Sequence, residues 1–318
     1  MTMKVFLIGY GRMAAKLALG VLQSGHELVG VFRADRLRHN FLDASIRDFF
    51  SNDDFYAIIK KYKIKEVNTN SVNNKRFISK IKKLEADVIL VGSCGEKFGK
   101  EILKAPNVAC VNVHPSLLPK YRGANPYFHT IKNGEKSSGV TFHLMNEKID
   151  RGDILMQEVV PISDVDTGQT LRIRTTHQAS AMVGELLNNF EEHLIIPIPQ
   201  NEAMASYYPV ISYEDLVIDW KKSAKTIYDL VRASYPWCCC YTRYKNNLLE
   251  IRGAGVVTYD GIVEDGGVVL NNDERGIVVA TGDKNKAILL TDVRFYGRFE
   301  NLFREQKLKK IRKNDRFE

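Results

Sequence analysis

Three short, almost unbroken apolar runs stand out in the first part of this 318-residue chain, at residues 3–8, 87–92 and 108–113. Runs without alternating polar positions are typical of strands buried on both faces of a parallel sheet. A further strand is expected at Leu28–Phe32, and helical patterns lie between the strands, at about 11–24, 53–62 and 74–84. This alternation predicts an α/β fold in which a doubly wound sheet carries helices on both faces. In such a fold, ligands bind at the carboxyl ends of the strands.

Two more strands, at about 139–145 and 154–160, and a helix from Asp166-Thr167 to about 192 complete this predicted domain. The stretch Ile195-Ile196-Pro197-Ile198-Pro199 cannot continue a helix, so a linker is expected at about 195–212. Beyond it, a helix at about 224–234 precedes short β-type runs that predict a small barrel. These runs lie at 248–251, 261–263, 267–270, 277–280 and 287–291. The sequence therefore predicts two domains, residues 1–200 and residues 212–318.

The composition is that of a globular protein, because 44% of the residues are apolar and 26% are charged. No apolar run reaches the roughly 18 residues of a membrane helix, and Val5–Gly9 is too short for a signal peptide. Five cysteines, three of them adjacent at 238–240, form neither a disulfide framework nor a spaced set of metal ligands. A reducing cytoplasm is therefore the expected location, and packing is the expected role of the adjacent cysteines.

The net charge is +8, from 46 Lys and Arg against 38 Asp and Glu. Such a balance favours an anionic partner, and it leaves a non-catalytic nucleic-acid binder open as one alternative. Half of the charge lies in a basic tail, where seven Lys and Arg residues from Arg304 to Arg316 accompany three acids from Glu305 to Glu318. We expect this tail to be a solvated helix or a frayed terminus.

A glycine-rich turn follows the first strand, with the sequence Gly9-Tyr10-Gly11-Arg12-Met13-Ala14. It fits the dinucleotide-binding fingerprint and raises a second alternative, an NAD(P)-dependent oxidoreductase. That mechanism needs an acid at the end of the second strand, where this chain has Arg33, with Asp35 two residues late. Arg33 suits a 2′-phosphate, but the glycines are also explained by a tight strand-to-helix turn alone.

The most informative segment is the end of the strand at 108–113, which delivers Asn112 and His114 to the same side of the sheet. About 36 residues later, the turn Lys148-Ile149-Asp150-Arg151-Gly152 offers a carboxylate between two strands. An amide and an imidazole can stabilise an oxyanion, and a carboxylate can orient the imidazole and help to manage an amine proton. Asn112, His114 and Asp150 are therefore the predicted catalytic residues for acyl transfer to an amine.

These residues lie in linked blocks that resemble the formyltransferase family that uses N10-formyltetrahydrofolate. The blocks are Asn112-Val113-His114-Pro115-Ser116-Leu117-Leu118-Pro119-Lys120-Tyr121-Arg122-Gly123, Pro126, Asn133-Gly134-Glu135, Gly139-Val140-Thr141 and Ile149-Asp150-Arg151-Gly152-Asp153-Ile154. In the second domain, Ile218-Asp219-Trp220, Val231-Arg232-Ala233 and Pro236-Trp237 resemble the entry to the OB-like C-terminal domain of methionyl-tRNA formyltransferases and their relatives.

The resemblance implies a Rossmann-like formyltransferase sheet followed by an OB-like β-barrel. It implies that His114 polarises the formyl oxygen, that Asn112 is its oxyanion partner and that Asp150 orients the imidazole. It also implies that N10-formyltetrahydrofolate is the co-substrate and that no metal is required. The implied folate contacts are Glu96, Lys97, Phe98, Ser116, Leu117, Leu118, Pro119, Asn146, Glu147, Lys148 and Ile149.

Two acceptors fit the two-domain layout: methionyl-tRNA, or a dTDP- or UDP-linked amino sugar used in surface polysaccharide biosynthesis. The tRNA enzymes carry a basic, glycine-rich insertion after the second strand, whereas residues 33–43 have arginines but no glycine. The segment Leu117–Gly123 resembles the domain that formylates UDP-4-amino-4-deoxyarabinose, although that enzyme has arginine where this chain has Ala124. We therefore predict a sugar-nucleotide N-formyltransferase and keep methionyl-tRNA as the alternative. The sequence does not decide the oligomeric state, and a homodimer is one option.

Overall fold

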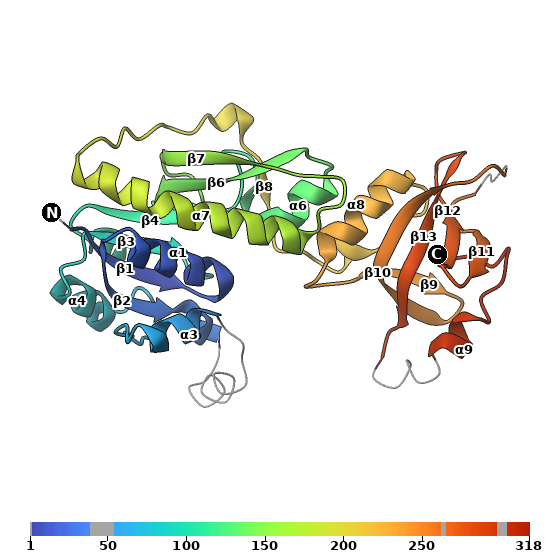
Figure 1. Cartoon of the computed structure of the whole chain (residues 1–318), viewed down its shortest axis with the longest axis horizontal. Helices are drawn as coiled ribbons and strands as arrows, with labels where there is room; N and C mark the ends of the chain where they lie inside the picture. The colour runs from blue at the N-terminus through green and yellow to red at the C-terminus, as the bar shows by residue number, and fades with distance from the viewer. Residues whose placement is uncertain (1, 39–53, 262–264, 298–303) are drawn as a thin grey trace. The chain divides into compact units, whose positions relative to one another are not determined.

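The computed structural model describes residues 2–38, 54–261, 265–297 and 304–318 (Figure 1). Its largest sheet has six strands in the order β2-β1-β3-β4-β6-β7. The strands are β1 (Lys4–Gly9), β2 (Glu27–Arg33), β3 (Val88–Gly92), β4 (Ala109–His114), β6 (Ser137–Leu144) and β7 (Ile154–Pro161). The first four pair in parallel, and β6 runs antiparallel to β4. The three apolar runs of the sequence are thus β1, β3 and β4, as predicted.

Helices cover both faces of this sheet, which confirms the predicted fold class. One face of β1 and β3 packs against α4 (Lys75–Lys83) and α5 (Lys100–Leu103), through Phe6, Ile89 and Phe77 among others. The other face packs against α1 (Gly11–Gln23), whose Leu17 approaches Gly92. From residue 172 onward, α7 (Gly168–Glu191) lies on α1, and there the Ser180 hydroxyl donates to the Lys16 carbonyl at 2.7 Å. The short helices η1 (Ala34–Arg38) and α3 (Asp54–Lys61) precede α4.

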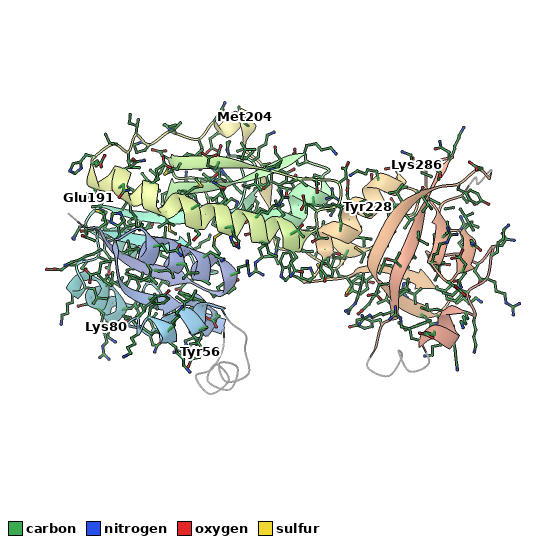
Figure 2. The ribbon with its side chains drawn as sticks, in the orientation of Figure 1. Tyr56, Lys80, Glu191, Met204, Tyr228 and Lys286 are labelled. Carbon is green, nitrogen blue, oxygen red and sulfur yellow. The ribbon has the colours of Figure 1, made fainter. Side chains whose placement is uncertain are left out.

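Residues 195–208 follow the six-stranded sheet closely. Ile198 pairs with Ile154 of β7 through two backbone hydrogen bonds of 2.8 and 2.9 Å. After η2 (Glu202–Met204), where Met204 is exposed (Figure 2), β8 (Tyr207–Tyr208) pairs in parallel with β5 (Arg122–Gly123). This segment therefore runs beside the strand end that carries the predicted catalytic residues.

The chain divides into two compact units, and each unit is built from three separate stretches of the sequence. Residues 124–137, 162–171 and 209–318 form the second unit, which includes α6 (Pro126–Lys132), η3 (Glu214–Leu216) and α8 (Ala224–Ser234). Within it, the buried guanidinium of Arg232 donates to Asp229 at 2.7 Å and to the Asp166 carbonyl at 2.7 Å. The bond to Asp166 holds α8 to the segment at residues 162–171, and the bond to Asp229 fixes the guanidinium within the helix.

The second unit also contains a five-stranded antiparallel sheet, in the order β11-β12-β13-β10-β9. The strands are β9 (Cys240–Tyr244), β10 (Asn247–Thr258), β11 (Val269–Asp273), β12 (Gly276–Ala280) and β13 (Lys286–Phe295). They confirm the predicted short strands, except that the run expected at 261–263 falls mostly outside the described residues.

Residues 314–318 close this sheet into a barrel. On one side they bond to β9, where Arg243 and Glu318 exchange two backbone hydrogen bonds of 2.9 Å. On the other side, the Phe317 N–H donates to the Gly267 carbonyl at 2.8 Å, just before β11. Phe317 is 2% exposed and packs between Trp220 and Tyr244. The expectation of a solvated helix or frayed terminus is therefore wrong for these residues, although α9 (Arg304–Leu308) precedes them.

No helix in the described part of the chain is both long enough and apolar enough to cross a membrane. All five cysteines are free thiols. In the adjacent group, Cys238 contacts the Ser234 carbonyl and Cys240 is fully buried against the Ser234 hydroxyl. Packing is thus the role that the contacts of these two residues indicate.

Candidate active site

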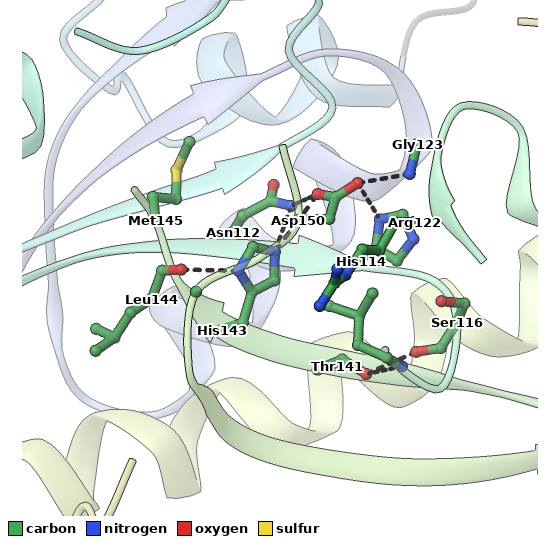
Figure 3. A network of polar contacts seen from close by, with 12 residues as sticks. Asn112, His114, Ser116, Arg122, Gly123, Thr141, His143, Leu144, Met145 and Asp150 are labelled. Carbon is green, nitrogen blue, oxygen red and sulfur yellow. Dashed lines mark hydrogen bonds and ion pairs between the residues drawn. The ribbon is translucent and has the colours of Figure 1, made fainter. Parts of the chain in front are cut away.

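The site begins with the pairing of β4 and β6. In their antiparallel register, Asn112 lies opposite His143, and His114 lies opposite Thr141. Residues at i and i+2 on a strand face the same side, and directly opposite residues are close neighbours. Two residues from each strand therefore form one polar patch at the carboxyl end of β4 (Figure 3).

Asp150 joins this patch from the turn between β6 and β7, where its φ of 54° places it in the left-handed region. Its carboxylate is 10% exposed and accepts hydrogen bonds from the Gly123 N–H at 2.8 Å and the Asn112 amide at 3.3 Å. The same carboxylate lies 3.6 Å from His114 Nδ1 and 3.6 Å from His143 Nε2. The structure thus brings the three predicted catalytic residues together.

Burial would raise the pKa of the Asp150 carboxyl, but the two histidines and the Gly123 N–H hold that pKa well below its usual value. Asp150 is therefore a carboxylate at neutral pH. In His114, burial lowers the pKa of the imidazole, against the raising influence of Asp150 and of the Tyr121 carbonyl. His114 thus rests as a neutral ring beside a negative charge.

The hydrogen-bond partners of His114 identify its tautomer. Nε2 lies 2.7 Å from the Tyr121 carbonyl oxygen, which can only accept, so Nε2 carries the hydrogen. Nδ1 of the neutral ring is then a lone pair that faces Asp150. A proton that arrives at Nδ1 produces an imidazolium held between a carboxylate and a carbonyl.

The Asn112 side chain, like that of His114, is held by its hydrogen-bond partners. His143 Nδ1 lies 2.8 Å from the Leu144 carbonyl and donates to it, which leaves Nε2 to accept from the Asn112 amide at 3.0 Å. The second amide hydrogen of Asn112 points to Asp150. The orientation of the Asn112 amide is therefore set by His143 and Asp150 together.

Thr141, the second residue of β6 in the patch, organises the loop that follows β4. Its hydroxyl donates to the Ser116 carbonyl at 2.6 Å and accepts from the Leu118 N–H at 3.3 Å and from Gln157 at 2.7 Å. Ser116 and Leu118 are buried, so their side chains support the loop from inside.

A cavity of about 140 Å³ opens beside Asn112, His143 and Asp150. Seven of the expected folate contacts line it: Glu96, Lys97, Phe98, Asn146, Glu147, Lys148 and Ile149. The other four (Ser116, Leu117, Leu118 and Pro119) and His114 are not among its lining residues. The structure therefore divides the expected contacts into a set around the cavity and a set in the loop that follows β4.

The loop at residues 94–98 is held in place from the neighbouring segment. The Glu96 carboxylate accepts from the Ser71 hydroxyl, from the Val72 N–H at 2.8 Å and from the Asn73 amide at 3.1 Å. Asn73 also donates to the Lys97 carbonyl at 2.9 Å. Because the Glu96 side chain is used in this way, the part of residue 96 that remains for a ligand is its backbone.

No group of three His, Cys, Asp or Glu side chains within the described ranges is arranged to hold a metal ion. The site is instead built from hydrogen-bond donors, a neutral imidazole and a carboxylate. This set can transfer a proton and stabilise an oxyanion, which are the two requirements of acyl transfer to an amine.

Comparison with known proteins gives the family. Residues 33–187 match the model of the formyl transferase domain, and residues 210–300 match the model of the formyl transferase C-terminal domain. The methionyl-tRNA formyltransferase of Caldanaerobacter subterraneus subsp. tengcongensis is 34% identical over 90% of this chain and 91% of its own length. The chain belongs to the formyltransferase family. The methionyl-tRNA formyltransferase of Halothermothrix orenii is 35% identical over 75% of this chain and 76% of its own length.

Among solved structures, this formyltransferase is similar to the N-formyltransferase from Helicobacter canadensis, which was crystallised with folinic acid and dTDP-3-aminofucose. The TM-score is 0.71 at 19% identity, over 92% of this chain and 100% of that one. At this identity the likeness confirms the fold. The family transfers one-carbon formyl groups from formyltetrahydrofolate, as the sequence analysis expected.

The glycine turn of this formyltransferase has a structural explanation. A Cβ atom on Gly9 would lie 2.1 Å from the Gly92 carbonyl oxygen, and Gly11 has a φ of 60°. Arg33 is fully buried, forms an ion pair with Glu66 at 3.3 Å and lies over the ring of Tyr56, which is labelled in Figure 2. The turn therefore packs α1 against the sheet, and Arg33 is already engaged inside the protein. With the family established, an oxidoreductase is set aside.

Sequence reasoning assigned no role in the site to His143 or Thr141, although Thr141 lies in one of the blocks that carry the family resemblance. Both contact the site because β6 pairs antiparallel with β4. The signal was present in the spacing, since residues 141 and 143 alternate in phase with 112 and 114. This spacing identifies His143 and Thr141 as site residues only when the register of the two strands is known, and the sequence alone does not supply that register.

Proposed function

We propose that this formyltransferase acts on the primary amine of a nucleotide-linked amino sugar, with N10-formyltetrahydrofolate as donor. The observation that supports the chemistry is that Asp150 contacts both Asn112, at 3.3 Å, and His114, at 3.6 Å, and that Asn112 and Asp150 line the cavity. In this proposal the new C–N bond forms between the amine and the formyl carbon, and the bond from that carbon to N10 breaks.

His114 carries the proton in this scheme. Its neutral ring accepts a proton from the attacking amine at Nδ1 and returns it to the leaving nitrogen, so protons balance over the reaction. Asp150 stabilises the imidazolium in between, at 3.6 Å, and the Tyr121 carbonyl does so from the other side at 2.7 Å. The imidazolium thus exists only while negative charge is present on the formyl oxygen, and its positive charge stabilises that oxygen through space.

Asn112 is the oxyanion partner. Its bond to Asp150 is the longer of its two hydrogen bonds, 3.3 Å against 3.0 Å. We infer that the formyl oxygen approaches this more weakly bonded amide hydrogen as charge develops there, while His143 keeps the amide in place. Donors that are fixed before the reaction stabilise an oxyanion better than mobile ones do.

The cavity suits the donor because its wall combines apolar side chains with residues of two loops. Val91, Phe98 and Met145 offer apolar surface, and the loops at residues 94–98 and 146–150 offer N–H and carbonyl groups. A pterin ring needs this combination, since its faces are apolar and its edge carries hydrogen-bonding groups. The N10 formyl group supplies the carbon that the amine attacks.

Two observations favour a sugar nucleotide over RNA. Arg33 and Arg36, in the stretch where the tRNA enzymes carry their insertion, both form ion pairs with Glu66, at 3.3 and 3.2 Å. Both side chains are thus engaged by one carboxylate within the protein; residues 39–43 of the stretch lie outside the described ranges. In addition, the Helicobacter canadensis N-formyltransferase, which was crystallised with dTDP-3-aminofucose, matches across 92% of this chain.

Methionyl-tRNA is the second candidate, because both methionyl-tRNA formyltransferases named above are about one-third identical to this chain. The deciding experiment incubates the enzyme and N10-formyltetrahydrofolate with dTDP- and UDP-amino sugars and, separately, with methionyl-tRNA. A gain of one formyl group by a sugar nucleotide, read by mass spectrometry, is the expected result. Formylation of methionyl-tRNA with no turnover of any amino sugar would reject the proposed acceptor.

A further inference from the structure

Gln200 uses its whole side-chain amide at the back of the Asp150 turn. Its Nε2 donates to the carbonyl oxygens of Asp150 at 2.9 Å and of Gly152 at 2.7 Å. Its Oε1 accepts two hydrogen bonds from Arg122, at 3.1 Å from Nε and 2.7 Å from Nη2. Both amide hydrogens and both lone pairs of Gln200 are therefore in use.

Arg122 is the fixed end of this arrangement. Its side chain is 3% exposed and also forms two hydrogen bonds with Glu202, at 2.9 and 2.8 Å. The next residue along the chain, Gly123, donates its N–H to the Asp150 carboxylate at 2.8 Å. The pair Arg122-Gly123 thus holds Asp150 at two points: the carboxylate directly, and the carbonyl through Gln200.

We propose that Gln200 is a positioning residue for formyl transfer: it ties the Asp150 backbone to Arg122 and so holds the Asp150 carboxylate against His114. The inference rests on the roles that the proposed function gives to Asp150 and His114. Asp150 needs such support because its φ of 54° is unfavourable for a residue with a side chain. Relaxation of the turn toward ordinary backbone angles would move the carboxylate away from the imidazole.

The Gln200→Glu variant separates the positioning role of Gln200 from a role in folding. A glutamate can still accept from the buried Arg122, but it has no hydrogen to donate to the Asp150 and Gly152 carbonyls and repels both. Glu202→Gln is the matched control, because Glu202 contacts the opposite side of Arg122 and is 58% exposed. The control perturbs the same arginine and leaves the bonds from Gln200 to the turn in place.

The test compares wild type with Gln200→Ala, Gln200→Glu, Glu202→Gln and Asp150→Asn. In each protein, the pKa of His114 is measured by NMR of labelled histidine, with no substrate present. The titratable neighbours of His114 are Asp150 and His143, and only Asp150 is displaced in this proposal. Formyl transfer to the acceptor that the wild type turns over gives kcat and KM, and thermal unfolding reports the fold.

Both Gln200 variants should lower the pKa of His114, in the direction of Asp150→Asn, and should lower kcat by about tenfold to a hundredfold. Glu202→Gln should change both quantities much less than the Gln200 variants do, because the bonds from Gln200 to the turn remain. An unchanged His114 pKa in the Gln200 variants, beside a clear shift in Asp150→Asn, would overturn the positioning role alone. An unchanged pKa in Asp150→Asn would overturn the Asp150–His114 pairing of the proposed function itself.

Discussion

Replacing Asp150 with asparagine removes one charge from the site and changes little else in shape. The native carboxylate accepts from the Gly123 N–H at 2.8 Å and the Asn112 amide at 3.3 Å, and it lies 3.6 Å from His114 Nδ1. An asparagine oxygen can keep the bond to Gly123. Its NH2 group then faces the NH2 group of Asn112, so one buried hydrogen bond becomes a contact between two donors.

The expected loss follows from these contacts. The donor left without an acceptor costs about 1–3 kcal/mol, and loss of the charged partner of the imidazolium costs about 1.5–3 kcal/mol. Together they correspond to about 2.5–6 kcal/mol of activation free energy, or about a 10²–10⁴-fold lower kcat. The pKa of His114 should also fall, because Asp150 raises it in the native site.

The pH dependence has a definite sign. His114 must be neutral to accept the amine proton, so kcat should rise with pH through the His114 pKa, which burial holds below the usual 6.5. Asp150→Asn should move this rise to still lower pH while the plateau drops. The matched control is Asp153→Asn, which removes a carboxylate from the same turn.

Initial rates of formyl transfer across the acid range, with thermal unfolding as a check of folding, test this prediction. A plateau within threefold of wild type, or a rise that moves to higher pH, would refute the proposed pairing of Asp150 with His114. An equal loss in Asp153→Asn would show that any charge change in the turn has the same effect.

Three further substitutions test other parts of the structure. His143→Ala should lower kcat about tenfold, the equivalent of one hydrogen bond of about 1.4 kcal/mol, because Asn112 loses its acceptor; unchanged kinetics would mean that Asp150 alone orients the amide. Asn73→Ala should raise the KM for N10-formyltetrahydrofolate with kcat little changed, because it frees the loop at residues 94–98; steady-state kinetics with the donor varied would show this. Phe317→Ala should cost about 3–5 kcal/mol in denaturant unfolding, whereas the exposed Lys313→Ala should stay within about 0.5 kcal/mol; similar values for both would contradict the barrel closure.

The α/β domain could be predicted in some detail because its signals are local. A strand buried on both faces must be apolar at every position, so β3 and β4 are visible in the sequence without knowledge of their partners. Asn112 and His114 could be predicted for the same reason, because they lie at the end of a strand that the sequence identifies. Asp150 could be found because a left-handed turn between two strands leaves a recognisable pattern of Asp and Gly.

The contacts that complete the site are not local, and this is why sequence reasoning did not find them. His143 meets Asn112 only through the register of an antiparallel pair, and Gln200 meets Asp150 across 50 residues of chain. The prolines at 197 and 199 indicated only that no helix forms there. Nothing in that composition predicts that the next residue bonds to the turn that carries the Asp150 carboxylate.

The basic tail shows why the net charge predicted the protein's partner less well than the sequence motifs did. Arg304 donates to the Val293 carbonyl and to Asp292, both at 2.7 Å, and Arg316 pairs with Asp265 at 3.0 Å. These cations hold a segment whose function is to place Phe317 in the barrel, so part of the net +8 reflects the closure of a domain. Net charge bears on solubility and on association, and it carries no information on which acceptor a site can formylate. That selection must come from groups near Asn112 and His114, where the substrate amine has to arrive.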